Sequence, residues 1–288
     1  MQPNFIIAGA AKSGTTSLYR YLCQHPDVFM PEQKEPHYFV ADEPFNFPIV
    51  AKQAEYDALF EGTTAAAVGE ASTGYLYFPK AARRIKAALP NTKIIVIARN
   101  PVDRAFSMWG HQVREGLEQQ SFTQAVNEEL DGQQRQQSGV EYGFNYCKLG
   151  FVADQIKQYQ TLFGKDNVLV GDYQHLKNNP ACFMQMVFEF LGVDSTFQGD
   201  YSGKFNPSGK PKFAGLHHCL NSTGWLRKAL VAPAKLILPS RYRHQLWRTL
   251  REWNIRSGQR HAMPQAMREK LESYFRFELR KLEKLITN

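Results

Sequence analysis

The sequence predicts an α/β fold: a three-layer sandwich with a central, mostly parallel sheet flanked by helices, followed by a helical C-terminal segment. Short continuous apolar runs, typical of strands that are covered on both faces, alternate with amphipathic segments. The chain also opens with a strand, a glycine-containing loop and a helix. Helices between successive strands favour parallel pairing with right-handed crossovers.

Four strands are predicted from apolar runs. Residues 5–8 form a short run that stops at Gly9, and residues 66–70 are a weaker candidate. Residues 93–98 are the strongest candidate, because a continuous β-branched run is typical of a central parallel strand. Residues 168–170 form a further short strand.

Helices are predicted where apolar residues recur at helical spacing or where proline and glycine mark the ends. Gly164 and Gly192 are the expected stops of two of them. Residues 130–145 and 199–215 are rich in turn-forming and polar residues and are predicted to be loops. The predicted helices cover residues 15–24, 79–89, 101–115, 151–163, 180–191 and, as one long helix, 264–286.

Composition describes a globular chain with a basic end. Of the 288 residues, 43% are hydrophobic and 22% charged, which excludes a disordered polyelectrolyte. The net charge of +8 divides into +13 from residue 204 onward and −5 before it. This final third suggests a polyanionic ligand, an anionic substrate or a membrane surface, with a solvated basic face as the alternative.

No apolar run approaches the roughly 20 residues of a membrane span, and the first residues lack a basic region followed by an apolar stretch. A cytoplasmic location is therefore expected. The four cysteines form no CxxC pair, so neither a metal site nor a redox motif is predicted, and buried or idle thiols are expected. They are Cys23, Cys147, Cys182 and Cys219.

The first chemical signal is the loop of residues 9–17, Gly-Ala-Ala-Lys-Ser-Gly-Thr-Thr-Ser. Such a loop before a helix directs backbone N–H groups and the positive helix end at a phosphate. It resembles the Walker pattern, but Thr15 occupies the lysine position and Lys12 lies inside the loop. Arg99 follows the strongest strand where a triphosphatase needs a carboxylate for Mg²⁺, so a P-loop-like fold without a metal is predicted. The alternative is a glycine loop that only turns the chain.

With these residues, the chain resembles the nucleotide-dependent sulfotransferases, which use 3′-phosphoadenosine 5′-phosphosulfate (PAPS). That family has a 5′-phosphosulfate loop of this kind, and an Arg at a strand end followed eight residues later by a Ser. Arg99 and Ser107 match this second motif and are implied to bind the 3′-phosphate. The resemblance covers about residues 4–215.

Further segments resemble the Golgi heparan sulfate sulfotransferases and their bacterial relatives. Residues 34–39, Lys-Glu-Pro-His-Tyr-Phe, match the segment that carries the catalytic carboxylate, so Glu35 is implied to be the general base and His37 is a weaker candidate. His111 matches a histidine of the N-sulfotransferases and is implied to face the acceptor; as a lone histidine it is equally typical of a surface or packing residue.

Two more segments extend the resemblance. Residues 70–75 resemble a stretch beside the acceptor, but Ala71 stands where the glycosaminoglycan enzymes carry a lysine, which argues against a heparan-like acceptor. Residues 206–212 resemble the basic loop that closes over the cofactor. The resemblance thus implies that Lys12, Glu35 and His111 are catalytic and that the cofactor is bound by Ala11, Lys12, Ser13, Gly14, Thr15, Thr16, Ser17, Arg99, Ser107, Lys210 and Lys212.

The expected function is transfer of a sulfuryl group from PAPS to a hydroxyl or amine, with a carbohydrate or lipid-linked acceptor, no metal and no nucleic-acid partner. A single domain is expected over residues 1–288, with a core at 4–215 and a basic helical part at 216–288. The mixed apolar and basic residues 225–243 could rest on a membrane or pack on the domain. The alternatives are a P-loop kinase or triphosphatase, and a non-catalytic module that binds nucleotides or polyanions.

Overall fold

The computed structural model describes residues 1–43, 49–133, 141–203, 209–211, 255–257 and 262–286. At its centre lies a parallel sheet with the strand order β2-β3-β1-β4-β5. Ile6 of β1 lies between Glu70 and Ile94 of the neighbouring strands. The strands are β1 Phe5–Gly9, β2 Val28–Phe29, β3 Ala67–Ala71, β4 Lys93–Ala98 and β5 Val168–Asp172.

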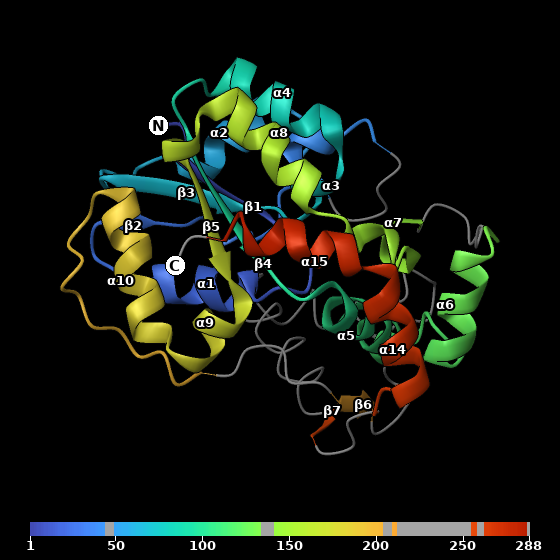
Figure 1. The fold of residues 1–288 in the computed structure, drawn as a ribbon. Coiled ribbons are helices and arrows are strands. Elements are labelled where there is room, and N and C mark those ends of the chain that lie inside the picture. Colours follow the sequence, from blue (N-terminus) through green and yellow to red (C-terminus); the bar gives the residue numbers. More distant parts are fainter. Residues whose placement is uncertain (44–48, 134–140, 204–208, 212–254, 258–261, 287–288) are drawn as a thin grey trace, which may run out of the picture.

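Successive side chains of the buried strands point to opposite faces of the sheet and so form two apolar cores, one on each face. Phe5 and Ile7 face α1 (Thr15–Leu22), α9 (Tyr173–Asn178) and α10 (Pro180–Leu191). Ile6 and Ala8 face the opposite layer (Figure 1). That layer contains α3 Gly74–Tyr77, α4 Pro79–Ala88, α5 Pro101–Arg114 and α8 Ala153–Phe163. The predicted three-layer α/β fold is confirmed.

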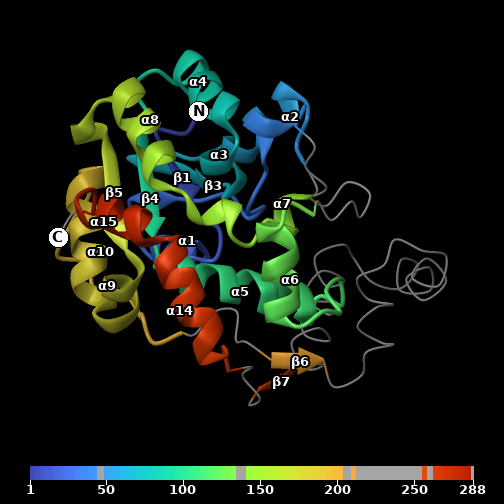
Figure 2. The ribbon, with the colours of Figure 1, turned by 45° about the vertical axis from the view of Figure 1, so that its right-hand side comes forward.

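Shorter elements surround these layers (Figure 2). Single 3₁₀ turns occur at Tyr38–Val40, Ala58–Phe60, Lys148–Gly150 and Lys165–Asn167. A separate antiparallel pair joins β6 (Gly209–Pro211) to β7 (Ile255–Ser257). The remaining described helices are α2 Gln53–Asp57, α6 Phe122–Leu130, α7 Glu141–Phe144, α14 Gln265–Tyr274 and α15 Arg276–Glu283.

The sequence-based element boundaries need three corrections. The expected loop at 130–145 contains α7, and the expected loop at 199–215 contains β6. The long helix expected at 264–286 is instead two helices, α14 and α15, which meet at Phe275. Phe275 is fully buried and leaves helical geometry at ψ 8°, because its ring inserts against Gly150 and Phe151.

The two C-terminal helices are fastened to the core by polar contacts. Arg268 of α14 pairs with Asp103 in the first turn of α5, with 2.8 Å between Nη2 and Oδ1. Glu278 of α15 is buried and accepts a hydrogen bond of 2.7 Å from the backbone N–H of Ala153, at the start of α8. The C-terminal helices therefore brace the layer that contains α5.

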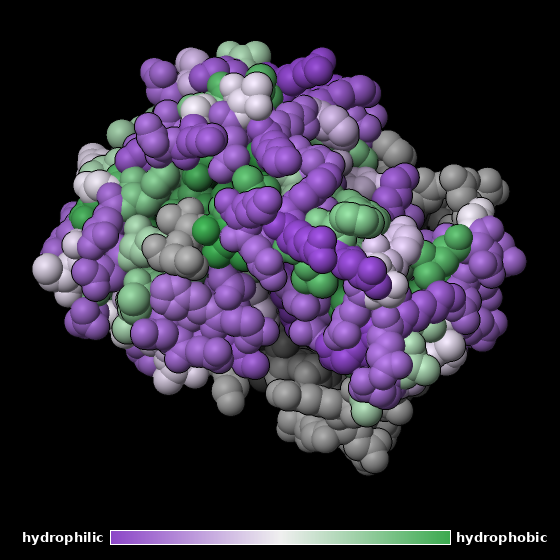
Figure 3. Space-filling model, viewed as in Figure 1, coloured by the Kyte–Doolittle hydropathy of each residue, from purple (hydrophilic) through white to green (hydrophobic). Residues whose placement is uncertain are grey.

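The outer surface is consistent with a molecule whose apolar residues are buried in these cores. The face seen in Figure 3 is mostly hydrophilic, with smaller hydrophobic areas between. Within the part of the chain that the structure describes, no helix has the length and apolar character needed to cross a bilayer.

Phe275→Ala should destabilise the protein by about 3–5 kcal/mol, since it removes a fully buried aromatic ring and leaves a cavity beside Gly150. The free energy of unfolding in urea measures this. Phe277→Ala is the matched control: its side chain is 74% exposed, so a change of only about 0.5 kcal/mol is expected. Equal effects of the two changes would contradict the anchoring role of Phe275.

Candidate active site

A cavity of about 350 Å³ opens at the carboxyl ends of the central strands. This is the edge of a parallel sheet where ligands bind in open α/β folds. Loops after β1, β3, β4 and β5 contribute to it, together with one face of α5. The residues that line it are Ala11, Lys12, Gly14, Thr15, Thr16, Ser17, Glu35, Thr73, Arg99, Ser107, Met108, His111, Gln112, Arg114, Tyr142, Gly143 and Tyr173.

The glycine loop forms one wall. Gly14 is the N-cap of α1 and has a φ of 90°, a conformation that other residues adopt with strain. A Cβ there would also lie 3.1 Å from the side chains of Tyr173 and Leu176. The first N–H groups of α1, from Thr15 onward, have no carbonyl partner within the helix, so they suit an anion.

Ser13 is the member of the predicted loop set that does not line the cavity. Its side chain is fully buried, and its N–H donates to the carbonyl of Ala10 over 3.2 Å. The Ser13 N–H is therefore already used within the loop, whereas the first N–H groups of α1 remain for an anion.

Lys12 places its ammonium group in this cavity. Burial and the charge of Arg114 lower the pKa of Lys12 to about 8, although Glu35 opposes the change. Lys12 is therefore protonated at neutral pH, in a setting where an added anion would be strongly attracted.

Arg99 joins the end of β4 to the loop. Its guanidinium donates to the carbonyl of Lys12 over 2.6 Å and lies 4.4 Å from the ring centre of Tyr173. Asn100 caps α5 by accepting from the N–H of Val102, which directs the helix and Ser107 along the cavity. The two predicted motifs thus meet in one cavity.

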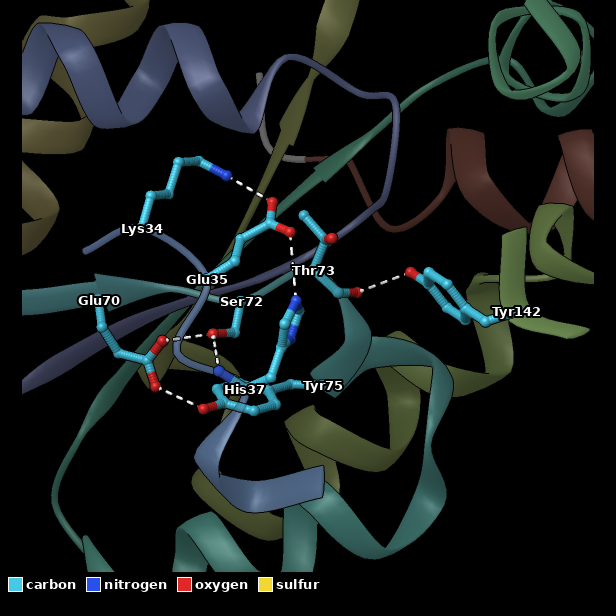
Figure 4. Close-up of polar contacts among 8 residues, drawn as sticks. All are labelled: Lys34, Glu35, His37, Glu70, Ser72, Thr73, Tyr75 and Tyr142. Atoms are coloured by element: carbon cyan, nitrogen blue, oxygen red, sulfur yellow. Dashed lines mark hydrogen bonds and ion pairs between the residues drawn. The ribbon is translucent and has the colours of Figure 1, made fainter. Parts of the chain in front are cut away.

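Glu35 enters the cavity from a loop held against the end of β3. Its N–H donates to the carbonyl of Ala71 over 3.0 Å, and its own φ is 60°. Its carboxylate lies between Lys34, at 2.5 Å, and the Nε2 of His37, at 3.2 Å (Figure 4). Burial would raise the pKa of Glu35, but the Lys34 charge and the His37 hydrogen bond outweigh it, so the pKa falls to about 2.

Behind this loop lies a fully buried carboxyl group, Glu70 of β3. It accepts hydrogen bonds from the hydroxyls of Ser72 (2.7 Å), Tyr75 (2.7 Å) and Tyr56 (3.1 Å). The Ser72 hydroxyl in turn accepts from the N–H of His37 over 3.1 Å (Figure 4). Burial raises the pKa of Glu70 to about 7 despite these donors. Glu70 thereby supports the loop that carries Glu35.

His111 and Arg114 lie one turn apart on α5, and both line the cavity. Arg114 Nη2 lies 2.6 Å from His111 Nδ1. Burial and the charges of Lys12 and Arg114 lower the pKa of His111 to about 2, so its ring is neutral. With an ionised carboxylate, a protonated lysine and a neutral imidazole, the cavity can accept a proton and stabilise a departing anion.

Several lining residues were missed by the sequence analysis. Arg114 lies seven residues after Ser107 and three after His111, so the helical period could have found it. Tyr173 follows the end of β5, where the rule for strand ends applies. Tyr142, whose hydroxyl donates to the Thr73 carbonyl over 3.3 Å, gave no signal because it lay in the expected loop.

The predicted lid falls largely outside the described residues. Lys210 lies in β6, whose backbone pairs with β7, and its side chain is not described. Lys212 and the segment 225–243 lie outside the described residues, as does Cys219. Cys23, Cys147 and Cys182 are free thiols.

Comparison with known proteins bears on this geometry. The profile of the sulfotransferase domain matches residues 2–206. The chain belongs to the sulfotransferase family. It is 35% identical to a crystal structure of a sulfotransferase from Alicyclobacillus acidocaldarius, with a TM-score of 0.66, covering 81% of this chain and 91% of that one. The sulfotransferase fold places the predicted phosphate loop and Arg99 at one edge of the sheet.

Curated relatives of this sulfotransferase include human bifunctional heparan sulfate N-deacetylase/N-sulfotransferase 1, 30% identical over 210 residues, or 71% of this chain and 24% of that protein. Bovine bifunctional heparan sulfate N-deacetylase/N-sulfotransferase 2 is 29% identical over 200 residues, which cover 66% of this chain and 22% of that protein. The chain thus spans about a quarter of the length of these relatives.

Glu70→Gln should change the stability of the sulfotransferase in a pH-dependent way. Because the folded-state pKa of Glu70 is raised from 4.5 to about 7, the wild type loses stability relative to the variant as pH rises through that window. The full difference corresponds to roughly 3 kcal/mol. Urea denaturation at pH 5 and pH 8 measures it.

The control for this prediction is Glu61→Gln, at an exposed position. Its effect on the free energy of unfolding should be the same at both pH values. A gap between wild type and Glu70→Gln that does not move in favour of the variant with rising pH would contradict the raised pKa of Glu70.

Proposed function

We propose that the cavity binds PAPS as sulfuryl donor and that Glu35 activates the acceptor. The supporting observation is that Arg99 and Ser107 line the same cavity as the glycine loop. One end of the donor would lie on the N–H groups at the start of α1, and its 3′-phosphate would lie against Arg99 and Ser107. Glycine at position 14 fits a loop of this kind, because a Cβ there would lie only 3.1 Å from the Tyr173 side chain.

In the proposed reaction, an acceptor hydroxyl or amine attacks the sulfur atom as the bond from sulfur to the 5′-phosphate oxygen breaks. The acceptor proton passes to Glu35, and the negative charge on the departing 3′,5′-bisphosphate is stabilised by Lys12. Because the Glu35 pKa is about 2, the carboxylate is ionised but weakly basic. Proton transfer would therefore follow bond formation, once the attacking atom has become acidic.

For the acceptor we propose a carbohydrate or glycolipid, with O- and N-sulfation both open. The curated relatives are named for heparan sulfate, which favours a saccharide. Ala71 lacks the cation of the glycosaminoglycan enzymes, and its side chain is buried. We also propose that the chain is a single domain with a cytoplasmic location, and that its basic C-terminal part contacts a membrane.

A kinase or triphosphatase is the second candidate, and the arrangement of carboxylates disfavours it. Asp172 does end β5, next to β4, but it caps α9 by accepting from the N–H of Gln174 and does not line the cavity. Glu70 of β3 is enclosed by three hydroxyl donors. Among the described lining residues Glu35 is the acidic one, and it is paired with Lys34.

Lys12→Ala and Glu35→Gln should each lower kcat by roughly 10²–10³, since each removes a group that acts in the transition state. Transfer of ³⁵S from labelled PAPS to a panel of sugars, lipids and phenols measures this. Circular dichroism should show both variants folded. Full turnover by Lys12→Ala would remove the loop from the mechanism; binding of 3′,5′-bisphosphoadenosine without transfer to any acceptor would favour a non-catalytic module.

Arg99→Met should weaken binding of 3′,5′-bisphosphoadenosine by at least about tenfold, because it removes a charged partner of the phosphate. In the wild type, thermal stabilisation by this compound should exceed that by ATP with Mg²⁺. Arg83→Met, at an exposed position on α4, is the control and should bind normally. Stronger stabilisation by ATP, or Mg²⁺-dependent ATP hydrolysis, would support the kinase alternative.

A further inference from the structure

The contact between Arg114 and His111 decides which ring nitrogen of the histidine carries the proton. Arg114 Nη2 lies 2.6 Å from His111 Nδ1. A guanidinium group can only donate hydrogen bonds, so Nδ1 must accept and has no proton. Since a neutral imidazole carries one proton, that proton lies on Nε2.

The charge state of the ring follows from its surroundings. The charges that act on His111 are those of Lys12 and Glu35, which line the same cavity, and of Arg114 on its own helix. Glu115 Oε1, also on this helix, lies 3.8 Å from Nδ1. Burial and the two cations outweigh Glu35 and keep the His111 pKa near 2. The ring is therefore neutral over the whole range in which enzymes are normally assayed.

Arg114 is itself held in place. Its Nε lies 3.2 Å from the Glu115 carboxylate, and its side chain is only 12% exposed. It lies three residues after His111, so the two share one face of α5, and both line the cavity. The planar guanidinium of Arg114 is thus held by Glu115 at Nε while its Nη2 contacts His111. Held in this way, it restricts the imidazole more than a mobile cation would.

We propose that Arg114 is a positioning residue that fixes His111 as an Nε2–H donor, so that His111 hydrogen-bonds an oxygen of the sulfuryl group and does not take the acceptor proton. This rests on the proposed function. The proton of the acceptor then has one destination, Glu35. His111 and Arg114 thus present hydrogen-bond donors to the cavity.

NMR of the full chain with ¹⁵N-labelled histidine tests the tautomer without any catalysis. In the wild type, His111 should show an Nε2–H tautomer that does not titrate between pH 5 and 8. Arg114→Met should give a mixture of tautomers and raise the pKa of His111, because a donor and a cation are lost. Arg114→Lys, which keeps both, should restore the wild-type tautomer. Arg83→Met is the control, and His111→Gln assigns the signal.

An Nδ1–H tautomer in the wild type, or no change in Arg114→Met, would overturn the proposal. In the transfer assay, kcat should fall on the order of 10²-fold in Arg114→Met, with partial rescue in Arg114→Lys. Unchanged kcat with a shifted tautomer would overturn the donor role. If the tautomers behave as expected but the wild type transfers sulfuryl to no acceptor with PAPS, the positioning by Arg114 stands and the proposed donor or acceptor class fails.

Discussion

The hydrogen bond from Arg99 to the carbonyl of Lys12 is the contact on which the site depends. It ties the end of β4 to the glycine loop after β1, two segments that are almost 90 residues apart in the sequence. Tyr173 lies against the same guanidinium and adds the end of β5 to the assembly. Together with the pairing of β1 and β4 and the hydrogen bond from the N–H of Ala10 to the carbonyl of Ile97, this contact sets the phosphate loop against the start of α5.

This joining brings positive charges close together. Burial lowers the pKa of both Lys12 and Arg99, and the charges of Arg114 and Arg99 add to the effect on Lys12. Repulsion between the cations and the loss of their hydration both carry an electrostatic cost. An anion that enters the cavity offsets this cost. Such a cavity therefore favours a ligand with several negative charges, and the low pKa of Glu35 shows that the acid in its wall stays charged as well.

Much of this could be predicted from the sequence, because buried parallel strands and phosphate loops leave local signals. The runs at 93–98 and 168–170 were found as strands, and ten of the proposed site residues, Glu35 among them, line one cavity. What could not be predicted depends on contacts across the fold. The helix break at Phe275 arises from packing against Gly150, and the support of Glu35 by Glu70 passes through Ser72 and a backbone N–H.

The contacts between the C-terminal helices and the core also determine how much of the chain an expressed fragment must retain. The sulfotransferase-domain match ends at residue 206, yet Arg268 pairs with Asp103, only four residues before Ser107. Helix α15 likewise satisfies the first N–H of α8 through Glu278. A fragment trimmed to the matched region would leave the outer side of α5 uncovered, so a minimal expression unit has to retain the last helices even though they contribute no group to the cavity.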